Sequence, residues 1–199
     1  MNEIHEDDDR FMVLRSLFKE EHLDWLHGRN YHPEAVYAPK NEWSYAWDYA
    51  HEGVRKHFLA LFHEWLGYDV DGIELDFVRS PCLFPPGKEE EGMPLMTELI
   101  RSAREVVNRA SESKGKPVLL GVRTPGTVDT CRRIGLDIET WLQEGLVDRL
   151  LIGGGLYPLQ QPGRRIGESG PSVRGSRLPV HQLRHPHLWI GRRFSRSRL

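Results

Sequence analysis

The sequence has little cysteine, with only Cys82 and Cys131 among 199 residues. Two cysteines in a chain of this length do not form the disulfide framework of a small secreted domain, so we expect both thiols to be reduced. No apolar run approaches the roughly 20 residues of a membrane-spanning helix, so no membrane partner is expected. The polar start, MNEIHEDDDR, is not a signal peptide. This predicts a non-exported protein if the start is complete, and leaves export of a longer parent protein open.

Lysine is absent after Gly155, where Glu168 is the single acidic residue against nine arginines. A nucleic-acid-binding tail would be expected to carry lysine beside arginine, so no nucleic-acid partner is predicted. The same stretch has no sustained helical or strand period and is rich in Arg, Ser, Pro and Gly. We therefore predict a domain at residues 1–155 and a basic tail at residues 156–199 that is disordered or translated out of frame.

Several chemical signatures are also missing. No glycine-rich phosphate loop joins a strand to a helix, which disfavours a dinucleotide-binding fold, and no cofactor is expected. No His-x-His, HExxH or paired-cysteine spacing predicts a metal site. No Ser-His-Asp or Cys-His nucleophile arrangement can be recognised.

Helical and strand patterns alternate between residues 49 and 153. The whole chain is 39% hydrophobic, which suffices for one core. Helical periodicity is predicted for residues 49–66 and 94–113, and in two pieces within residues 127–145. Strands are predicted for residues 70–78 and 117–125 and for the apolar segment VDRLLIGGG that follows Gly145. This alternation is typical of parallel α/β architecture, either a closed barrel or an open sheet.

The strand at residues 70–78 carries acids on one face. Period-two geometry directs Ile73, Leu75 and Phe77 toward helices and Glu74, Asp76 and Val78 to the opposite face. In a parallel barrel the second face points to the axis, and Asp76 lies nearer the carboxyl end, where active sites are built. We therefore predict Asp76 and Glu74 as catalytic carboxylates.

The next strand offers a cation on the same face. Alternation of side chains along this strand places Val118, Leu120 and Val122 against helices. It leaves Leu119, Gly121 and Arg123 facing inward. Arg123 would then pair with Asp76 or Glu74, or bind an anionic or hydroxyl-rich ligand. The alternative is an interior ion pair between Glu74 and Arg123 that only fills the barrel.

The first 48 residues contain little regular pattern apart from a short helix predicted near residues 18–26. Trp47 closes an aromatic stretch, which is either a loop over a sugar site or an anchor to the barrel rim. Asn2, Glu3 and His5 are interpreted as the end of an earlier strand, although a solvated acidic loop is the alternative. Metal binding by His5 with nearby carboxylates stays open.

Four segments resemble a family when taken together: MNEIHE, FKEEHLDWLHG, the run from WDYAHEGVRKHF through YDVDGIELDFVRSP, and GLDIETWLQEGLVD. Over residues 1–155 the chain is similar to bacterial glycosyl hydrolase-like proteins close to the family-ten-like barrels. The most specific part couples a helix beginning His-x-x-Val-Arg, at residues 51–55, to the strand YDVDGIELDFVR.

The resemblance implies a partial (β/α)8 TIM barrel, truncated at its N-terminus and frameshifted at its C-terminus, since a complete barrel needs roughly 250 residues. It implies a carbohydrate substrate, carboxylate acid/base catalysis and no required metal. By this resemblance Asp76 has the acidic role at the end of the strand, and Glu74 and Arg79 have supporting roles. Asn2 and Glu3 correspond to the end of an earlier strand. His5, Arg123 and Trp47 complete the predicted substrate-binding set.

One departure limits the activity that is expected. The strand also resembles the chitinase pattern Asp-Gly-x-Asp-x-Asp-x-Glu, but Val78 replaces its final acid. Glycoside hydrolysis ordinarily uses two carboxyl groups, and the partner of Asp76 could be Glu3, one of Glu89–Glu91 or a residue on missing strands. Such a fragment would expose strand edges and hydrolyse weakly or not at all. A non-catalytic carbohydrate-binding barrel and a metal-dependent barrel enzyme acting on a sugar remain the alternatives, and the oligomeric state is not predicted.

Overall fold

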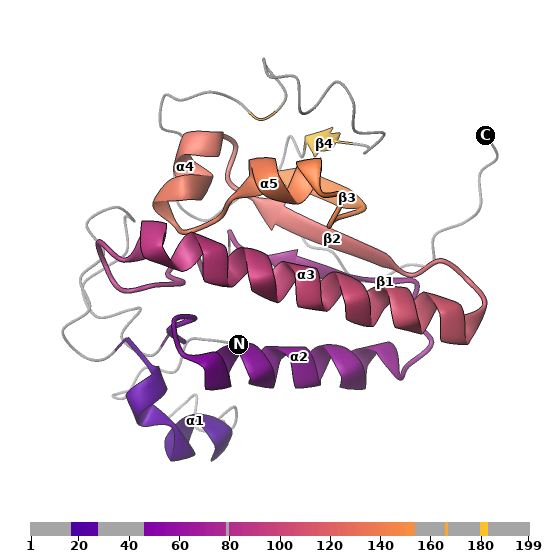
Figure 1. Cartoon of the computed structure of the whole chain (residues 1–199), viewed down its shortest axis with the longest axis horizontal. Helices are drawn as coiled ribbons and strands as arrows, with labels where there is room; N and C mark the ends of the chain where they lie inside the picture. The colour runs from indigo at the N-terminus through magenta and orange to yellow at the C-terminus, as the bar shows by residue number, and fades with distance from the viewer. Residues whose placement is uncertain (1–16, 28–45, 79, 154–165, 167–179, 183–199) are drawn as a thin grey trace, which may run out of the picture.

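The computed structural model describes residues 17–27, 46–78, 80–153, 166 and 180–182 (Figure 1). The predicted alternation of helices and strands is confirmed between residues 52 and 152. In chain order the elements are α1 (Leu17–Glu21), the 3-10 helix η2 (Leu23–Trp25), α2 (Glu52–Leu66), β1 (Gly72–Asp76), α3 (Glu89–Lys114), β2 (Leu119–Thr124), α4 (Val128–Arg133), α5 (Ile138–Gln143), β3 (Arg149–Ile152) and β4 (Val180–Gln182).

The strands form one parallel sheet in the order β1-β2-β3-β4. Helix α3 joins β1 to β2, and α4 and α5 join β2 to β3, as parallel pairing requires. The α/β class with a parallel sheet is therefore confirmed. The three-residue strand β4 lies inside the tail, for which the sequence pattern predicted no strand; the division of the chain at residue 155 stays a prediction.

One face of the sheet carries the helices. Ile73 and Leu75 of β1 and Leu120 of β2 pack against a cluster contributed by α2 and α3. Its helical members are Phe62, Leu66, Ala103, Val106 and Val107. These are the residues that helical and period-two spacing assign to the inner surfaces, because helix and sheet must each bury their apolar side. Figure 1 shows α2 and α3 running side by side along the sheet.

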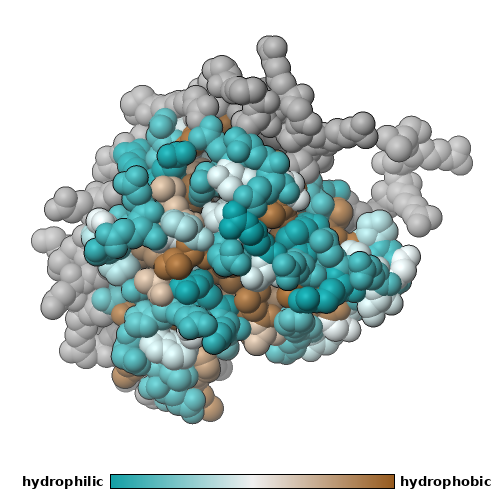
Figure 2. All heavy atoms as spheres, in the orientation of Figure 1, coloured by the Kyte–Doolittle hydropathy of each residue, from teal (hydrophilic) through white to brown (hydrophobic). Residues whose placement is uncertain are grey.

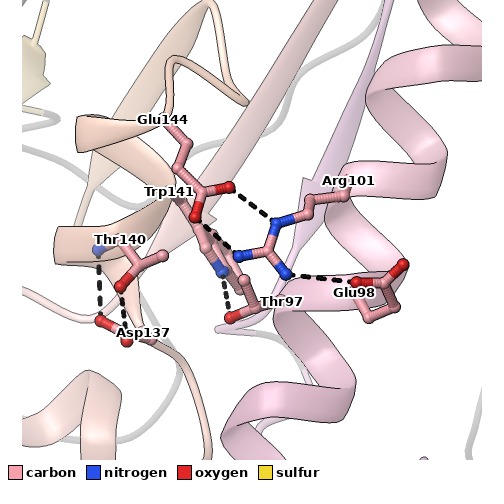
Figure 3. A network of polar contacts seen from close by, with 7 residues as sticks. All are labelled: Thr97, Glu98, Arg101, Asp137, Thr140, Trp141 and Glu144. Atoms are coloured by element: carbon pink, nitrogen blue, oxygen red, sulfur yellow. Dashed lines mark hydrogen bonds and ion pairs between the residues drawn. The ribbon is translucent and has the colours of Figure 1, made fainter.

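The same face continues over β2 and β3 toward α5. Val122, Leu150 and Ile152 belong to a second cluster that includes the fully buried Trp141 of α5. The indole Nε1 of Trp141 donates a hydrogen bond of 3.0 Å to the Thr97 hydroxyl of α3. Nearby, Arg101 of α3 donates to both carboxylate oxygens of Glu144, at 2.6 and 2.7 Å (Figure 3). Buried and exposed polar contacts thus join α3 to α5.

Helix α3 begins five residues earlier than the predicted residue 94. Proline is common at a first helical position, which made Pro94 the apparent start, yet Pro94 lies inside the helix. The actual first turn contains Glu89, Glu90 and Glu91, whose charges suit the positive end of the helix dipole. The predicted stop at Gly115 is confirmed, since this glycine adopts the left-handed φ of 61° after the last turn.

Strand β1 ends at Asp76, two residues before the predicted end. The Asp76 carboxylate accepts a hydrogen bond of 2.9 Å from the backbone N–H of Val78, which turns the chain out of the strand. Val78 therefore lies beyond the end of the strand, and its side chain is buried. Phe77 does reach the helix side, where its ring lies 5.8 Å from that of Trp141.

Hydrophilic residues cover most of the molecular face built by α2, α3 and α5, with hydrophobic residues visible in the seams between them (Figure 2). Cys82 and Cys131 are buried and form no disulfide with each other. No helix among the described residues has the length and apolar character needed to cross a bilayer.

Candidate functional site

The face of the sheet opposite the helices brings together Glu74, Asp76 and Arg123. Glu74 and Asp76 alternate with the core residues of β1 and are exposed. The strand register places Asp76 directly beside Arg123 of β2. The residue pair lies toward the carboxyl ends of both strands, the end predicted from the sequence.

The carboxylate of Asp76 is held by two donors. Its Oδ2 accepts a hydrogen bond of 2.9 Å from Nη1 of Arg123, and its Oδ1 accepts the bond from Val78 N–H. The side chains of Asp76 and Arg123 are 33% and 23% exposed. A partly exposed ion pair of this kind contributes little to stability, so its main physical effect is to orient the carboxylate.

Arg123 is positioned from the other side by β3. Its Nε donates to the carbonyl oxygen of Gly153 at 3.4 Å, just after that strand. Of the two pairings that the sequence left open, the ion pair with Asp76 is observed. The guanidinium therefore bridges the carboxyl ends of β1 and β3 across its own strand.

Glu74 differs electrostatically from its neighbour. Partial burial raises the pKa of the Glu74 carboxyl, the nearby negative charge of Asp76 raises it further, and Arg123 opposes both effects. A carboxyl whose pKa is raised retains its proton to higher pH and can donate it. Glu74 is therefore suited to the role of a proton donor.

The raised pKa of Glu74 predicts how the free energy of unfolding depends on pH. The folded chain binds the Glu74 proton more tightly than the unfolded chain does, so this group lowers stability as pH rises through the window between its unfolded and folded pKa values. Glu74→Gln should therefore raise the free energy of unfolding at pH 7 and leave it unchanged well below the ordinary glutamate pKa. Because the side chain is exposed, we expect a gain under about 1 kcal/mol. Urea unfolding at both pH values measures it, and an equal gain at both would contradict the assignment.

Trp47 lies in a buried aromatic cluster. Its ring is 6% exposed, contacts Phe18 and His57 at centroid distances of 5.7 and 6.3 Å, and has the Lys19 ammonium 5.6 Å from its centroid. Burial lowers the pKa of Lys19 to about 8. This environment matches the anchoring role that the sequence left open, and substrate binding by Trp47 stays a prediction.

The remaining predicted site residues cannot be placed. Asn2, Glu3, His5 and Arg79 lie outside the described residues, and their roles stay predictions. The acids considered as partners of Asp76, Glu89–Glu91, form the first turn of α3, where the carboxylate of Glu91 pairs with Lys88 at 2.8 Å. Within the described part of the chain, no group of three or more His, Cys, Asp or Glu side chains is arranged to hold a metal ion.

Arg149 is a residue of this face that sequence reasoning missed. Arg149 is the first residue of β3, in which buried residues, Leu150 and Ile152, alternate with partly exposed ones. Arg149 therefore lies on the same face of the sheet as Glu74 and Arg123. The signal was available in VDRLLIGGG, because the parity argument used for the first two strands applies equally to the third.

Comparison with known proteins finds distant structural likeness. No family model and no curated protein sequence matches the chain. Among solved structures, chitinase ChiA74 from Bacillus thuringiensis superposes with a TM-score of 0.42 at 18% identity, over 67% of this chain. The match spans 27% of the chitinase chain. A superposition this loose carries no argument about activity, so the function has to be inferred from the site.

Proposed function

We propose that this chain is part of a TIM-barrel protein related to glycoside hydrolases, in which Asp76 and Glu74 act on a carbohydrate. The observation that carries the proposal is the placement of both acids, with Arg123, on the face of the sheet opposite the described helices, toward the carboxyl end of parallel strands. In a barrel that face lines the interior, and catalytic groups stand at that end.

In the part of the chain that the structure describes, the one-sided distribution of helices supports a barrel over a doubly wound sheet. The core residues of β1, β2 and β3 that meet α2, α3 and α5 all share one parity along their strands. A doubly wound sheet covers both faces with helices, whereas a barrel places them only outside. Charged side chains on the opposite face agree with a polar barrel interior near the site.

The two acids would divide the work of glycosidic bond hydrolysis. Glu74, with its raised pKa, suits proton donation to the leaving oxygen, and Asp76 suits the nucleophile or the base that activates water. Two residues of strand rise separate their backbones by roughly 7 Å. Arg79, Asn2, Glu3, His5 and Trp47 would complete the sugar contacts.

The ion pair between Asp76 and Arg123 favours a second candidate, a carbohydrate-binding barrel without catalysis. A carboxylate held by a guanidinium and a backbone N–H is a good acceptor for sugar hydroxyls, while the same contacts weaken it as a nucleophile. Binding without turnover is the result that separates the two candidates.

Glycan-array binding followed by hydrolysis assays tests the proposal on the full-length protein. We expect Asp76→Asn to reduce hydrolysis of any bound sugar by roughly a hundredfold or more and to retain binding, because the amide keeps the shape and loses the reactive charge. Glu105→Gln is the control, since Glu105 is exposed on α3. Hydrolysis unchanged in Asp76→Asn would contradict a catalytic Asp76, and binding without hydrolysis in either protein would select the second candidate.

A further inference from the structure

The helices α1 and η2 dock against α2 through aromatic rings. They lie within residues 17–27, which we call the docked segment, and Figure 1 shows α1 beside the N-terminal part of α2. His57 of α2 stacks on Phe18, with ring centroids 3.8 Å apart and an interplanar angle of 11°. The Trp25 ring lies against the first turn of α2, where a Cβ on Gly53 would be 2.2 Å from it. Ring contacts therefore hold the docked segment on α2.

Hydrogen bonds also join the docked segment to the chain before α2 and to the loop after β1. The backbone N–H of His27 donates to the carbonyl oxygen of Ala46 at 3.1 Å. That of Asp48 donates to the carbonyl oxygen of Trp25 at 3.0 Å. Nε2 of His27 lies 3.2 Å from the carbonyl oxygen of Cys82, and because a carbonyl only accepts, this ring nitrogen is the donor. Cys82 belongs to the loop that begins at the candidate site, so the docked segment is connected to that loop.

Side chains that carry or gain a positive charge gather in this interface. They are Lys19, His22, His27, His51 and His57. The buried Asp48 faces two of them, because its carboxylate lies 4.0 Å from Nε2 of His51 and its charge also acts on His27. Protonation of the imidazoles therefore leaves the interface with an excess of positive charge.

The other charged groups of the described segments in this interface compensate that excess poorly. Most of them are exposed, namely Glu20, Glu21, Asp24, Glu52 and Lys56. Arg55 adds a further cation, whose guanidinium donates to the carbonyl oxygens of Tyr49 and Ala50. Burial raises the pKa of the Tyr49 hydroxyl, which therefore stays neutral. Water and salt screen exposed charges, so these groups have little effect on charge inside the interface.

Two of the imidazoles lose their protons more readily in the docked state. Burial lowers the pKa of His27, and His51 lowers it further, while a hydrogen bond to a backbone carbonyl and the charge of Asp48 oppose this. Burial also lowers the pKa of His57, as does the charge of His22. A released imidazole returns to its ordinary pKa of about 6.5. The undocked state therefore binds more protons, so docking is favoured above about pH 6.5 and is weakened as the pH falls below that value.

We propose that the docked segment is released from α2 when the pH falls below about 6.5, because imidazolium charges accumulate in the interface. Lys19 adds to the repulsion, since its ammonium is already charged below about pH 8. Release would break the hydrogen bond from His27 to the Cys82 carbonyl and so loosen the loop at the candidate site. The inference does not depend on the activity proposed above.

Hydrogen exchange of the full-length protein tests the proposal at pH 7.5 and 5.5, with each rate corrected for the intrinsic exchange rate at that pH. The reporters are the backbone amides of residues 27 and 48, whose hydrogen bonds join the docked segment to the chain before α2. We expect roughly three- to tenfold more exchange at pH 5.5, since one released imidazole shifts the opening equilibrium by up to about tenfold per pH unit. Amides of α3 should change less than about twofold.

A double variant removes the two imidazoles whose pKa values are lowered. His27→Gln retains a donor for Cys82, and His57→Phe retains a ring to stack on Phe18, whereas neither new side chain titrates. The acid effect at the reporters should fall below about twofold. His63→Gln is the matched control, because His63 is an exposed histidine of α2, and it should retain the wild-type effect.

Nuclear magnetic resonance titration of the wild-type imidazoles gives a measurement that does not require the variants to fold. At least two imidazoles should have titration midpoints below about pH 6.5. The proposal would be overturned by the absence of an acid effect at the reporters, by an effect of equal size in α3, or by an effect that persists in the double variant. Imidazoles that all titrate at or above their ordinary value would also overturn it.

Discussion

Gly135→Ala should lower the free energy of unfolding by about 2–5 kcal/mol. Gly135 has a φ of 84°, a conformation that costs an L-residue about 1–2 kcal/mol. An added Cβ would lie 2.5 Å from the Phe84 ring and 3.3 Å from the carbonyl oxygen of Glu89. Overpacking of this kind typically costs about 1–3 kcal/mol more. The sum is a large fraction of the stability of an ordinary domain.

The Phe84 ring cannot escape this collision. It is 1% exposed, and a Cβ on Gly92 of α3 would also lie 2.5 Å from the ring. The two glycines therefore lie on either side of the Phe84 ring. They allow this ring to pack closely and so fix the loop that follows β1, which begins at the candidate site.

Denaturant unfolding of a small set of variants separates strain from packing. Gly87→Ala is the control for strain, because Gly87 has a φ of 80° and nothing within 4 Å of its Cβ position. Gly92→Ala is the control for packing, because its φ is not left-handed. Gly135→Ala should cost more than either one. A loss no larger than that of Gly87→Ala would show that the ring is not held in place.

Asp148→Ala should lower the free energy of unfolding by about 2–4 kcal/mol. Its Oδ2 accepts hydrogen bonds from Nη2 of Arg104 at 2.5 Å and from the backbone N–H of Leu120 at 2.7 Å. Alanine removes the oxygen that accepts both bonds. It leaves the guanidinium of Arg104, whose side chain is only 15% exposed, without a carboxylate partner. The loss of a partly buried charge partner is costly because the remaining charge has no compensating water.

A second ion pair from α3 provides the comparison. Arg101 and Glu144 are as close as 2.6 Å, but their side chains are 41% and 37% exposed. Glu144→Ala should therefore cost under about 1 kcal/mol. Asp148→Asn should fall between Asp148→Ala and wild type, since it retains an acceptor for Leu120. Similar losses for Asp148→Ala and Glu144→Ala would contradict the role assigned to burial.

The elements with strong periodicity were predicted well, and several of their ends were not. Alternation along residues 70–78 correctly separated Ile73 and Leu75 from Glu74 and Asp76, because side chains of a strand point to opposite faces whatever surrounds them. The start of α3 was placed at Pro94, since local propensity cannot show that the preceding acids join the helix. The end of the strand was predicted two residues too late, because the backbone N–H of Val78 donates a hydrogen bond to the Asp76 carboxylate and turns the chain.

For the candidate site, the sequence predicted the face and the end of the sheet where Asp76 and Arg123 meet. It left open whether Glu74 or Asp76 would pair with Arg123, because either acid is within reach of a flexible arginine. The strand register, which depends on packing between segments far apart in the chain, placed Asp76 opposite Arg123. It also aligned Arg149 with Glu74 across Gly121, a neighbourhood between residues 75 positions apart.

The sequence by itself determined the α/β class, the order of helices and strands, and the polarity of each strand face, since these follow from local periodicity. Only the tertiary structure decided which charged residues became neighbours, that Phe84 is bracketed by two glycines, and that Asp148 joins α3 to β2. These features depend on register and on close packing between distant segments. Both arise from the fit of whole surfaces, which no local pattern of residues specifies.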